Sequence, residues 1–213
     1  MKLLDLFSGA GGAAMGYHQA GFEVTGVDHL PQPHYPFVFV QADALEYLAE
    51  FGQEYDVIHA SPPCQGYSKA RHIHRSYDHP DLVGETRDGL QKTGKPYVIE
   101  NVPGAPLFNP LLLCGSMFPE LRVYRHRLFE GSPILSMAPA MCNHSFTLPP
   151  YKIAFHTLDN HEYITVTGHN FRAEDGRRAM QIDWMTRDEL AQAVPPAYTR
   201  YIGEQLQRIL GYE

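Results

Sequence analysis

Cysteine is scarce in this chain, and its scarcity excludes one class of protein. The 213 residues include three cysteines, Cys64, Cys114 and Cys142. Three cysteines are too few, and an odd number, for a disulfide framework. We therefore expect a reducing compartment and a fold that its hydrophobic core stabilises. A hydrophobic content of 44% is ample for that core.

Long apolar runs are absent as well. No stretch approaches the ~20 apolar residues that a membrane span needs. Met1-Lys2 leads straight into Leu-Leu-Asp, without the apolar region of a signal peptide. We therefore expect a cytoplasmic protein without a membrane partner, and a monomer is favoured over an oligomer.

The chain also lacks an excess of positive charge. A net charge of -7 argues against a general polyanion binder, because nonspecific affinity for nucleic acid comes mainly from neutralised phosphates. A nucleic-acid surface would have to be local, and a solvated face is the alternative for each candidate patch. The candidates are Lys69, Arg71, His72, His74 and Arg75; Arg122, Arg125 and Arg127; and Arg172, Arg177 and Arg178.

A glycine turn follows the first apolar run. The order is a strand at 3–7, Ser8-Gly9-Ala10-Gly11-Gly12, and a helix-compatible segment at 13–20. Strand, glycine turn and helix form the start of a nucleotide-binding βαβ unit, in which the backbone can approach a ligand closely. The spacing is not G-x-G-x-x-G, so this turn alone is a weak signal and does not indicate a dinucleotide site.

Acids at the ends of the next two predicted strands strengthen that signal. Asp28 follows a strand at 22–27, and Asp43 follows one at 37–40. In such folds an acid after the second strand bonds a ribose hydroxyl pair, and Asp43 could meet an adenine amino group. Asp43 could equally be a helix cap. Together with the glycine turn they indicate an α/β, Rossmann-like domain that binds an adenosine-containing cofactor.

Cys64 follows a predicted buried strand at 55–60 that Ser61-Pro62-Pro63 ends. Proline has no donor for the ladder, so the strand stops there. A thiol just past the carboxyl end of a strand lies where open α/β sheets bind ligands, which makes Cys64 a candidate nucleophile. The alternative is an inert buried cysteine.

Glu100 ends another predicted strand, at 96–102. Burial would raise its pKa and let it donate a proton, although a structural salt bridge is the alternative. The segment 122–129 alternates with period two, which predicts a strand with Arg125 and Arg127 on one face. Paired arginines on one face favour recognition of a carbonyl or oxyanion.

The remaining sequence predicts a small second unit and a final helix. Composition shifts between 131 and 171 towards proline and histidine, which indicates a small β or irregular subdomain after a catalytic domain at 1–130. Tyr198, Ile202, Leu206 and Leu210 form a helical stripe, so 172–213 should pack back on the sheet. A zinc ion could staple the subdomain, but the spacing of Cys142, His144, His156, His161 and His169 matches no standard zinc pattern, and we expect polar surface and no metal.

These residues resemble the cytosine-5 DNA methyltransferase family, in family order along nearly the whole chain. The matching blocks are Asp5-Leu-Phe-Ser-Gly-Ala-Gly-Gly12, Pro62-Pro-Cys-Gln65, Glu100-Asn-Val102, Arg125-His-Arg127 and Ala191-Gln-Ala-Val-Pro-Pro196. The short spacing between the blocks resembles phage or prophage members. The resemblance implies a Rossmann-like fold dependent on S-adenosylmethionine, and a double-stranded DNA substrate in a bacterial or phage-infected cell.

The resemblance also implies the roles of the site residues. Cys64 would add to carbon 6 of a flipped cytosine, and Glu100 would hydrogen-bond the exocyclic amine and N3 and supply a proton there. Arg127 would bind the carbonyl at position 2, with Arg125 supporting it or meeting the thiolate. The implied cofactor contacts are Phe7, Ser8, Gly9, Gly11, Gly12, Asp28, Asp43, Pro62 and Gln192.

Departures from the family pattern affect three regions. Ala191-Gln192 replaces the usual Gly-Asn, so Gln192 is transferred only weakly, and Val123 replaces a glutamine that opens the arginine block. The target-recognition region is limited to 131–171, which predicts a short or degenerate recognition sequence, since each good base contact supplies ~1–3 kcal/mol of discrimination.

Three other functions compete with this interpretation. An RNA cytosine-5 methyltransferase is less favoured because the Cys-Phe-Thr signature of that branch is missing. A silent DNA-binding relative would not need Cys64, Glu100 and Arg127 together. A Rossmann oxidoreductase fails on the glycine spacing and would not explain Pro-Pro-Cys.

Overall fold

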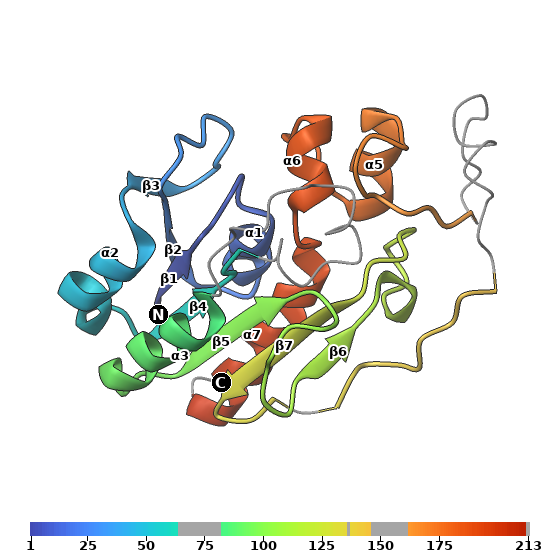
Figure 1. Ribbon diagram of the computed structural model, residues 1–213. Coiled ribbons are helices and arrows are strands. Elements are labelled where there is room, and N and C mark those ends of the chain that lie inside the picture. Colours follow the sequence, from blue (N-terminus) through green and yellow to red (C-terminus); the bar gives the residue numbers. More distant parts are fainter. Residues whose placement is uncertain (64–81, 136, 146–161, 212–213) are drawn as a thin grey trace.

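A mixed seven-stranded sheet forms the centre of the molecule in the computed structural model, which describes residues 1–63, 82–135, 137–145 and 162–211 (Figure 1). Its strand order is β3-β2-β1-β4-β5-β7-β6. The first five strands in this order are parallel, whereas β7 runs antiparallel to both β5 and β6. Their bounds are β1 Lys2–Leu6, β2 Glu23–Asp28, β3 Val38–Gln41, β4 Val57–Ala60, β5 Tyr97–Asn101, β6 Leu111–Leu113 and β7 Arg127–Ser132.

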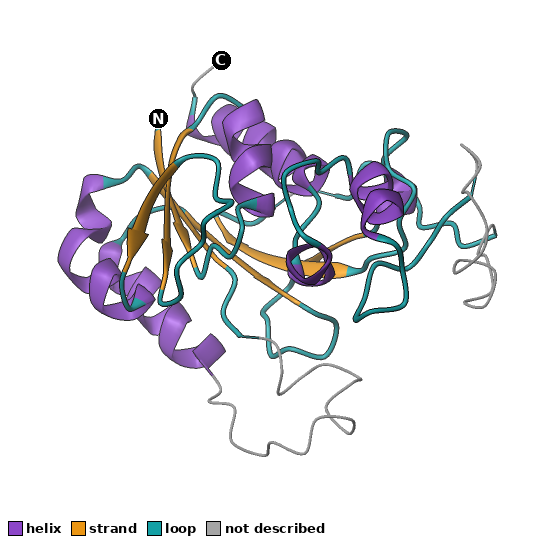
Figure 2. Ribbon diagram, turned by 90° about the horizontal axis from the view of Figure 1, so that it is seen from above, coloured by secondary structure: helices purple, strands orange, loops and turns teal. Residues whose placement is uncertain are grey.

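Helices cover both faces of this sheet (Figure 2). Helices α1 (Gly12–Gln19) and α7 (Pro196–Leu210) pack together over one face, and their buried side chains share a core with Leu3, Val24 and Val98. Helices α2 (Ala44–Phe51) and α3 (Leu82–Thr93) cover the other face. A short helical turn, η1, spans Gly52–Glu54. The near-continuous burial of β4 and β5 follows from this double cover, as expected for parallel strands between two helical layers.

The remaining elements are short. They are η3 (Gly115–Met117), α5 (Ala173–Met180) and α6 (Arg187–Gln192). Thr186 begins α6 with a capping box, in which its side chain accepts from Glu189 and the Glu189 side chain reaches back. Among the described residues, no helix combines the length and the apolar character needed to cross a bilayer.

The strands predicted at 3–7, 22–27, 37–40, 55–60 and 96–102 and the helix predicted at 13–20 are confirmed, with ends shifted by one or two residues. The final helical stripe is confirmed as well: Tyr198, Ile202 and Leu206 are buried in α7. The sequence patterns did not predict β6, α5 or α6, whose runs are too short to show a clear period.

The prediction of a continuous strand over 122–129 was wrong. β7 begins only at Arg127, because the preceding residues turn to another segment: Tyr124 N donates to Ile164 O at 2.8 Å, and Ile164 N donates to Arg122 O at 3.0 Å. Ile164 is fully buried in the main core. The predicted boundary between 130 and 131 lies inside β7, and the division into 1–130, 131–171 and 172–213 stays a prediction.

Candidate active site

The glycine turn lies at the carboxyl end of β1, between that strand and α1. Phe7, Gly9 and Gly11 all have positive φ, of 56°, 49° and 83°. Glycine adopts this conformation without strain, whereas Phe7 does not, and such strain in a non-glycine residue is found mainly at functional sites. A Cβ built on Gly9 meets nothing within 4 Å, so the backbone there faces open space.

The turn is tied to the end of β2. Gly9 N donates to Asp28 Oδ2 at 3.0 Å, and the buried Ser8 donates its backbone N–H to Val27 O at 3.1 Å. Asp28 Oδ1 accepts a further bond from Leu30 N at 3.0 Å. Asp28 therefore holds the shape of the turn, and its contact with a cofactor ribose stays a prediction.

Asp43 behaves as the helix cap that was the alternative to a cofactor contact. Its Oδ1 accepts from Leu45 N at 2.9 Å and from Glu46 N at 3.0 Å, at the start of α2. The residue is exposed, so capping leaves it open to solvent. Its contact with an adenine amino group stays a prediction.

Asp5 is a functional candidate that the sequence patterns missed. It is fully buried in β1, and among the described residues neither carboxylate oxygen has a partner at the distance and angles of a normal hydrogen bond. Burial raises its pKa well above the usual value, and the charges of Asp28 and Glu100 raise it further. The nearby Tyr35 hydroxyl interacts with the carboxyl and offsets this rise in pKa only in part. The signal for Asp5 was visible as an acid inside an apolar strand just before the glycine turn.

The strand that leads to Cys64 is held against the strand that carries Glu100. β4 ends at Ala60, and the buried Pro62 accepts a bond from Asn101 Nδ2 to its carbonyl oxygen at 3.0 Å. Asn101 is the last residue of β5, so this bond joins the carboxyl ends of the two strands. Cys64 lies outside the described residues, as does the predicted basic patch at 69–75.

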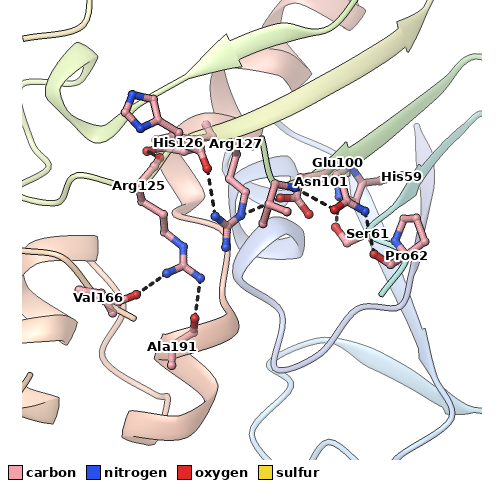
Figure 3. A network of polar contacts seen from close by, with 12 residues as sticks. His59, Ser61, Pro62, Glu100, Asn101, Arg125, His126, Arg127, Val166 and Ala191 are labelled. Carbon is pink, nitrogen blue, oxygen red and sulfur yellow. Dashed lines mark hydrogen bonds and ion pairs between the residues drawn. The ribbon is translucent and has the colours of Figure 1, made fainter. Parts of the chain in front are cut away.

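Glu100 and Arg127 form a buried ion pair at this edge of the sheet (Figure 3). Arg127 Nε lies 2.8 Å from Glu100 Oε1, and the side chains are 13% and 8% exposed. Burial raises the pKa of Glu100. Three influences lower it and offset that effect only in part: the charge of Arg127, a hydrogen bond from Ser61 and the charge of Arg125. The carboxyl thus retains a proton to a higher pH than an exposed glutamate, although its partner is a cation.

A line of polar side chains runs behind Glu100. Tyr17 Oη lies 3.0 Å from His59 Nδ1, and His59 Nε2 lies 3.0 Å from Ser61 Oγ. Burial lowers the pKa of His59 to about 3, so the ring is neutral at physiological pH. A neutral ring that accepts from Tyr17 donates to Ser61, which orients the Ser61 hydroxyl towards Glu100.

Arg125 is almost fully buried and braces the backbone. It donates through Nη1 to Val166 O and through Nη2 to Ala191 O, the latter at 2.7 Å (Figure 3). Its own carbonyl accepts from Tyr198 Oη at 2.6 Å. Arg125 therefore links the arginine block to the closing block, and its predicted role beside Arg127 or the thiolate stays a prediction.

The closing block packs on the glycine turn. A Cβ on Gly12 would lie 2.4 Å from Val194 O, so only glycine allows this approach. Trp184, which precedes α6 in the sequence, also contacts the turn: its Nε1 donates to Ala10 O at 2.9 Å. Gln192 ends α6 and is exposed, and its cofactor contact stays a prediction.

Residues 1–106 match the family model described as C-5 cytosine-specific DNA methylase. The type II methyltransferase M.FnuDI of Fusobacterium nucleatum is 36% identical over 77 residues, and M.NgoPII of Neisseria gonorrhoeae is 33% identical over 79 residues. Each alignment covers 33% of this chain, and 22% and 23% of the relatives. The chain thus spans less than a quarter of the length of these curated relatives.

Solved structures share the whole fold. A prophage-encoded candidate DNA modification methyltransferase from E. coli has a TM-score of 0.67 at 16% identity, and S. pombe Dnmt2 has 0.59 at 12% identity. Both comparisons cover 99% of this chain and 99% of the other. At such identities the likeness shows the fold alone, and it confirms the predicted Rossmann-like methyltransferase fold.

Proposed function

Because residues 1–106 belong to the C-5 cytosine-specific DNA methylase family, we propose that the protein methylates carbon 5 of cytosine in double-stranded DNA, with S-adenosylmethionine as the donor. The observation that carries this proposal is the buried Glu100–Arg127 pair, which joins the carboxyl end of β5 to the start of β7. Only β4 separates β5 from β1, the strand that leads into the glycine turn. We place the reaction in the cytoplasm of a bacterial or phage-infected cell, with a monomer as the active form.

The residues around the glycine turn fit that donor. The open backbone at Gly9 allows a ligand to approach, and Asp28 lies where a ribose hydroxyl pair would bind. The buried Asp5, whose neighbour Tyr35 carries no positive charge, suits the ammonium group of an amino-acid moiety, because a cation there would offset the cost of ionising the carboxyl. When bound, S-adenosylmethionine supplies an electrophilic methyl group.

Each protein side chain has a defined task in this proposal. Carbon 5 of cytosine is a poor nucleophile, so the Cys64 thiolate adds to carbon 6 and moves electron density to carbon 5. Glu100, whose pKa is raised by burial, donates a proton to N3 and makes that addition favourable. Arg127 orients Glu100 and binds the carbonyl at position 2, while loss of the carbon 5 proton expels the thiolate.

A covalent trap tests the proposal. The test uses DNA that carries 5-fluorodeoxycytidine in place of deoxycytidine. Fluorine on carbon 5 cannot leave as a proton does, so the final elimination is blocked, and we expect a denaturation-resistant protein–DNA adduct that depends on S-adenosylmethionine. The variant Cys64→Ser should form no adduct and transfer no methyl group, yet still bind the donor. Adduct formation by Cys64→Ser, or none by the parent protein with donor present, would refute the assigned chemistry.

A further inference from the structure

A second cluster of reactive side chains lies away from the Glu100 site. Cys114, His126, Cys142 and His144 each offer one ligand atom, and all four atoms lie within 4.8 Å of one another. Cys142 Sγ is 2.9 Å from His144 Nε2 and 3.3 Å from His126 Nε2, and Cys114 Sγ is 3.3 Å from His144 Nε2. Two sulfurs and two imidazole nitrogens therefore converge on one point.

The distances match the edges of a tetrahedral metal site. Zinc binds thiolate sulfur at about 2.3 Å and imidazole nitrogen at about 2.0–2.1 Å, which sets the sulfur–nitrogen edge of a tetrahedron near 3.6 Å. The three observed sulfur–nitrogen edges of 2.9–3.3 Å would widen by about 0.3–0.7 Å to receive an ion, and the widest separations among the four atoms, which lie within 4.8 Å of one another, would shorten. Hydrogen bonding alone is a poor reason for this cluster, because a thiol is a weak donor and a weak acceptor.

We propose that these four side chains bind one zinc ion as a closed, structural site. Two thiolates and two neutral imidazoles form a ligand set that zinc prefers, and they leave no open position for a substrate. On binding, each thiol releases its proton to solvent, so the dipositive ion is balanced by two thiolates and affinity weakens at low pH.

The ion would join three segments that no disulfide connects among the described residues. Cys114 follows β6, His126 precedes β7, and Cys142 and His144 lie in the described stretch 137–145. His126 lies between the two arginines of the arginine block, and its carbonyl accepts from Arg127 Nη1 at 3.0 Å. The zinc site would therefore hold the backbone from which Arg127 extends to Glu100 (Figure 3).

The chain order of the ligands explains why their spacing predicted no metal. Only Cys142 and His144 are near neighbours in sequence, and the other two ligands come from separate elements. His156 and His161, considered with them, lie outside the described residues, and His169 pairs with Asp188 at 3.3 Å. The proposed ligand set thus differs from the sequence prediction of polar surface without a metal.

Metal analysis of the full chain, purified without a histidine tag or chelator, tests the site. We expect about one zinc per chain by mass spectrometry of the elements. Replacement by cobalt should produce a thiolate-to-cobalt charge-transfer band and the intense visible bands of a tetrahedral ion. Cys142→Ser and His144→Ala should lose both signals, whereas His169→Ala, which changes an exposed histidine outside the cluster, should keep them.

Two results would overturn the proposal. One is a folded protein that binds neither zinc nor cobalt. The other is an intact mass lighter by two hydrogens, with peptide mapping that assigns the disulfide to Cys114 and Cys142. The cobalt spectrum of the parent protein decides the matter even where a variant fails to fold. Zinc retained by Cys64→Ser separates this test from the proposed methyl transfer, since that variant loses activity alone.

Discussion

Glu100 combines burial with a cationic partner, and those two influences act on its proton in opposite directions. Burial is the larger, so its pKa is raised although Arg127 Nε lies at 2.8 Å. The Ser61 hydroxyl, oriented through His59 and Tyr17, adds a fixed donor to the same carboxyl. A carboxyl held in this way can both donate a proton and keep a single orientation.

Replacing Glu100 by glutamine should lower kcat by about a hundred-fold to ten-thousand-fold, the usual loss when a general acid is removed. The amide keeps the shape of the side chain, so binding of DNA and the structure should change little. Single-turnover methyl transfer from tritiated donor measures the effect, with Glu85→Gln on the exposed side of α3 as the control. Activity within tenfold of the parent would show that Glu100 supplies no proton.

Asp5 should make the folded protein less stable as the pH rises. The unfolded carboxyl ionises near its usual pKa, whereas the folded one keeps its proton because burial raises its pKa. The stability that Asp5 contributes is thus full below the unfolded pKa and is lost as the pH rises through the folded pKa. Asp5→Asn is neutral at every pH, so its advantage in free energy of unfolding should grow from acidic to neutral pH.

Urea titrations of both proteins between acidic and neutral pH, without the donor, measure that difference. A constant difference across this range would contradict the raised pKa of Asp5. The same variant should bind S-adenosylmethionine more weakly, because the carboxylate is the proposed partner of the donor's ammonium group.

For single residues, the sequence identified several side chains of the site but not the hydrogen bonds that they form. Glu100 and Asp28 were predicted as acids at the carboxyl ends of strands, and parallel strands bring such ends to one edge of the sheet. Arg127 was predicted from the period-two pattern of 122–129, and it lies 2.8 Å from Glu100. The polar chain through His59 could not be predicted, because its partners come from α1, β4 and β5 and only the fold joins them.

Between elements, α1 and α7 approach each other too closely for a side chain at Gly16. A Cβ there would lie 2.0 Å from Thr199 Oγ1 and 2.1 Å from Pro196 O. Gly16→Ala should therefore destabilise the protein by about 1–3 kcal/mol, the usual cost of overpacking. Gly84→Ala is the matched control in α3: its Cβ meets nothing within 4 Å, so it should stabilise by about 0.5–1 kcal/mol.

Urea denaturation of both alanine variants checks this pair. Equal effects of the two substitutions would mean that the α1–α7 contact is looser than described. The contrast also shows what pattern reading can reach: the apolar stripe predicted α7 and its buried face, whereas the close approach to α1 depends on which helix packs opposite.

For the whole molecule, the arginines that suggested DNA-binding patches are largely engaged within the fold. Arg172 lies 2.6 Å from Asp175, Arg177 donates to Met185 O at 2.8 Å, and Arg122 donates to two backbone carbonyls at 2.7 Å. With a net charge of -7, phosphate contacts must then come mainly from elsewhere. The patch at 69–75 is the remaining candidate from the sequence.

Substituting Lys69, Arg71 and Arg75 together by glutamine should make DNA binding less sensitive to salt. Each lost phosphate contact lowers the slope of log K against log salt by about 0.9, so the change should be about 2–3. Arg172→Gln should alter the slope less, because its charge is already paired with Asp175. Fluorescence anisotropy over a salt series measures both slopes, and equal slopes would show that the 69–75 patch does not contact phosphate.

The two ends of the sequence complete one site, and this arrangement bears on how the chain folds. Thr199 Oγ1 donates to Ala13 O, Trp184 Nε1 donates to Ala10 O, and Gln207 Nε2 donates to Ala20 O, so the last helix closes around the first turn. Contacts between residues so distant in sequence are slow to form. During synthesis the glycine turn leaves the ribosome early but acquires its final neighbours only when α7 emerges. A ribosome-bound nascent chain stalled before residue 196 should therefore retain no donor, and the ability to bind it should arise late and in a single step.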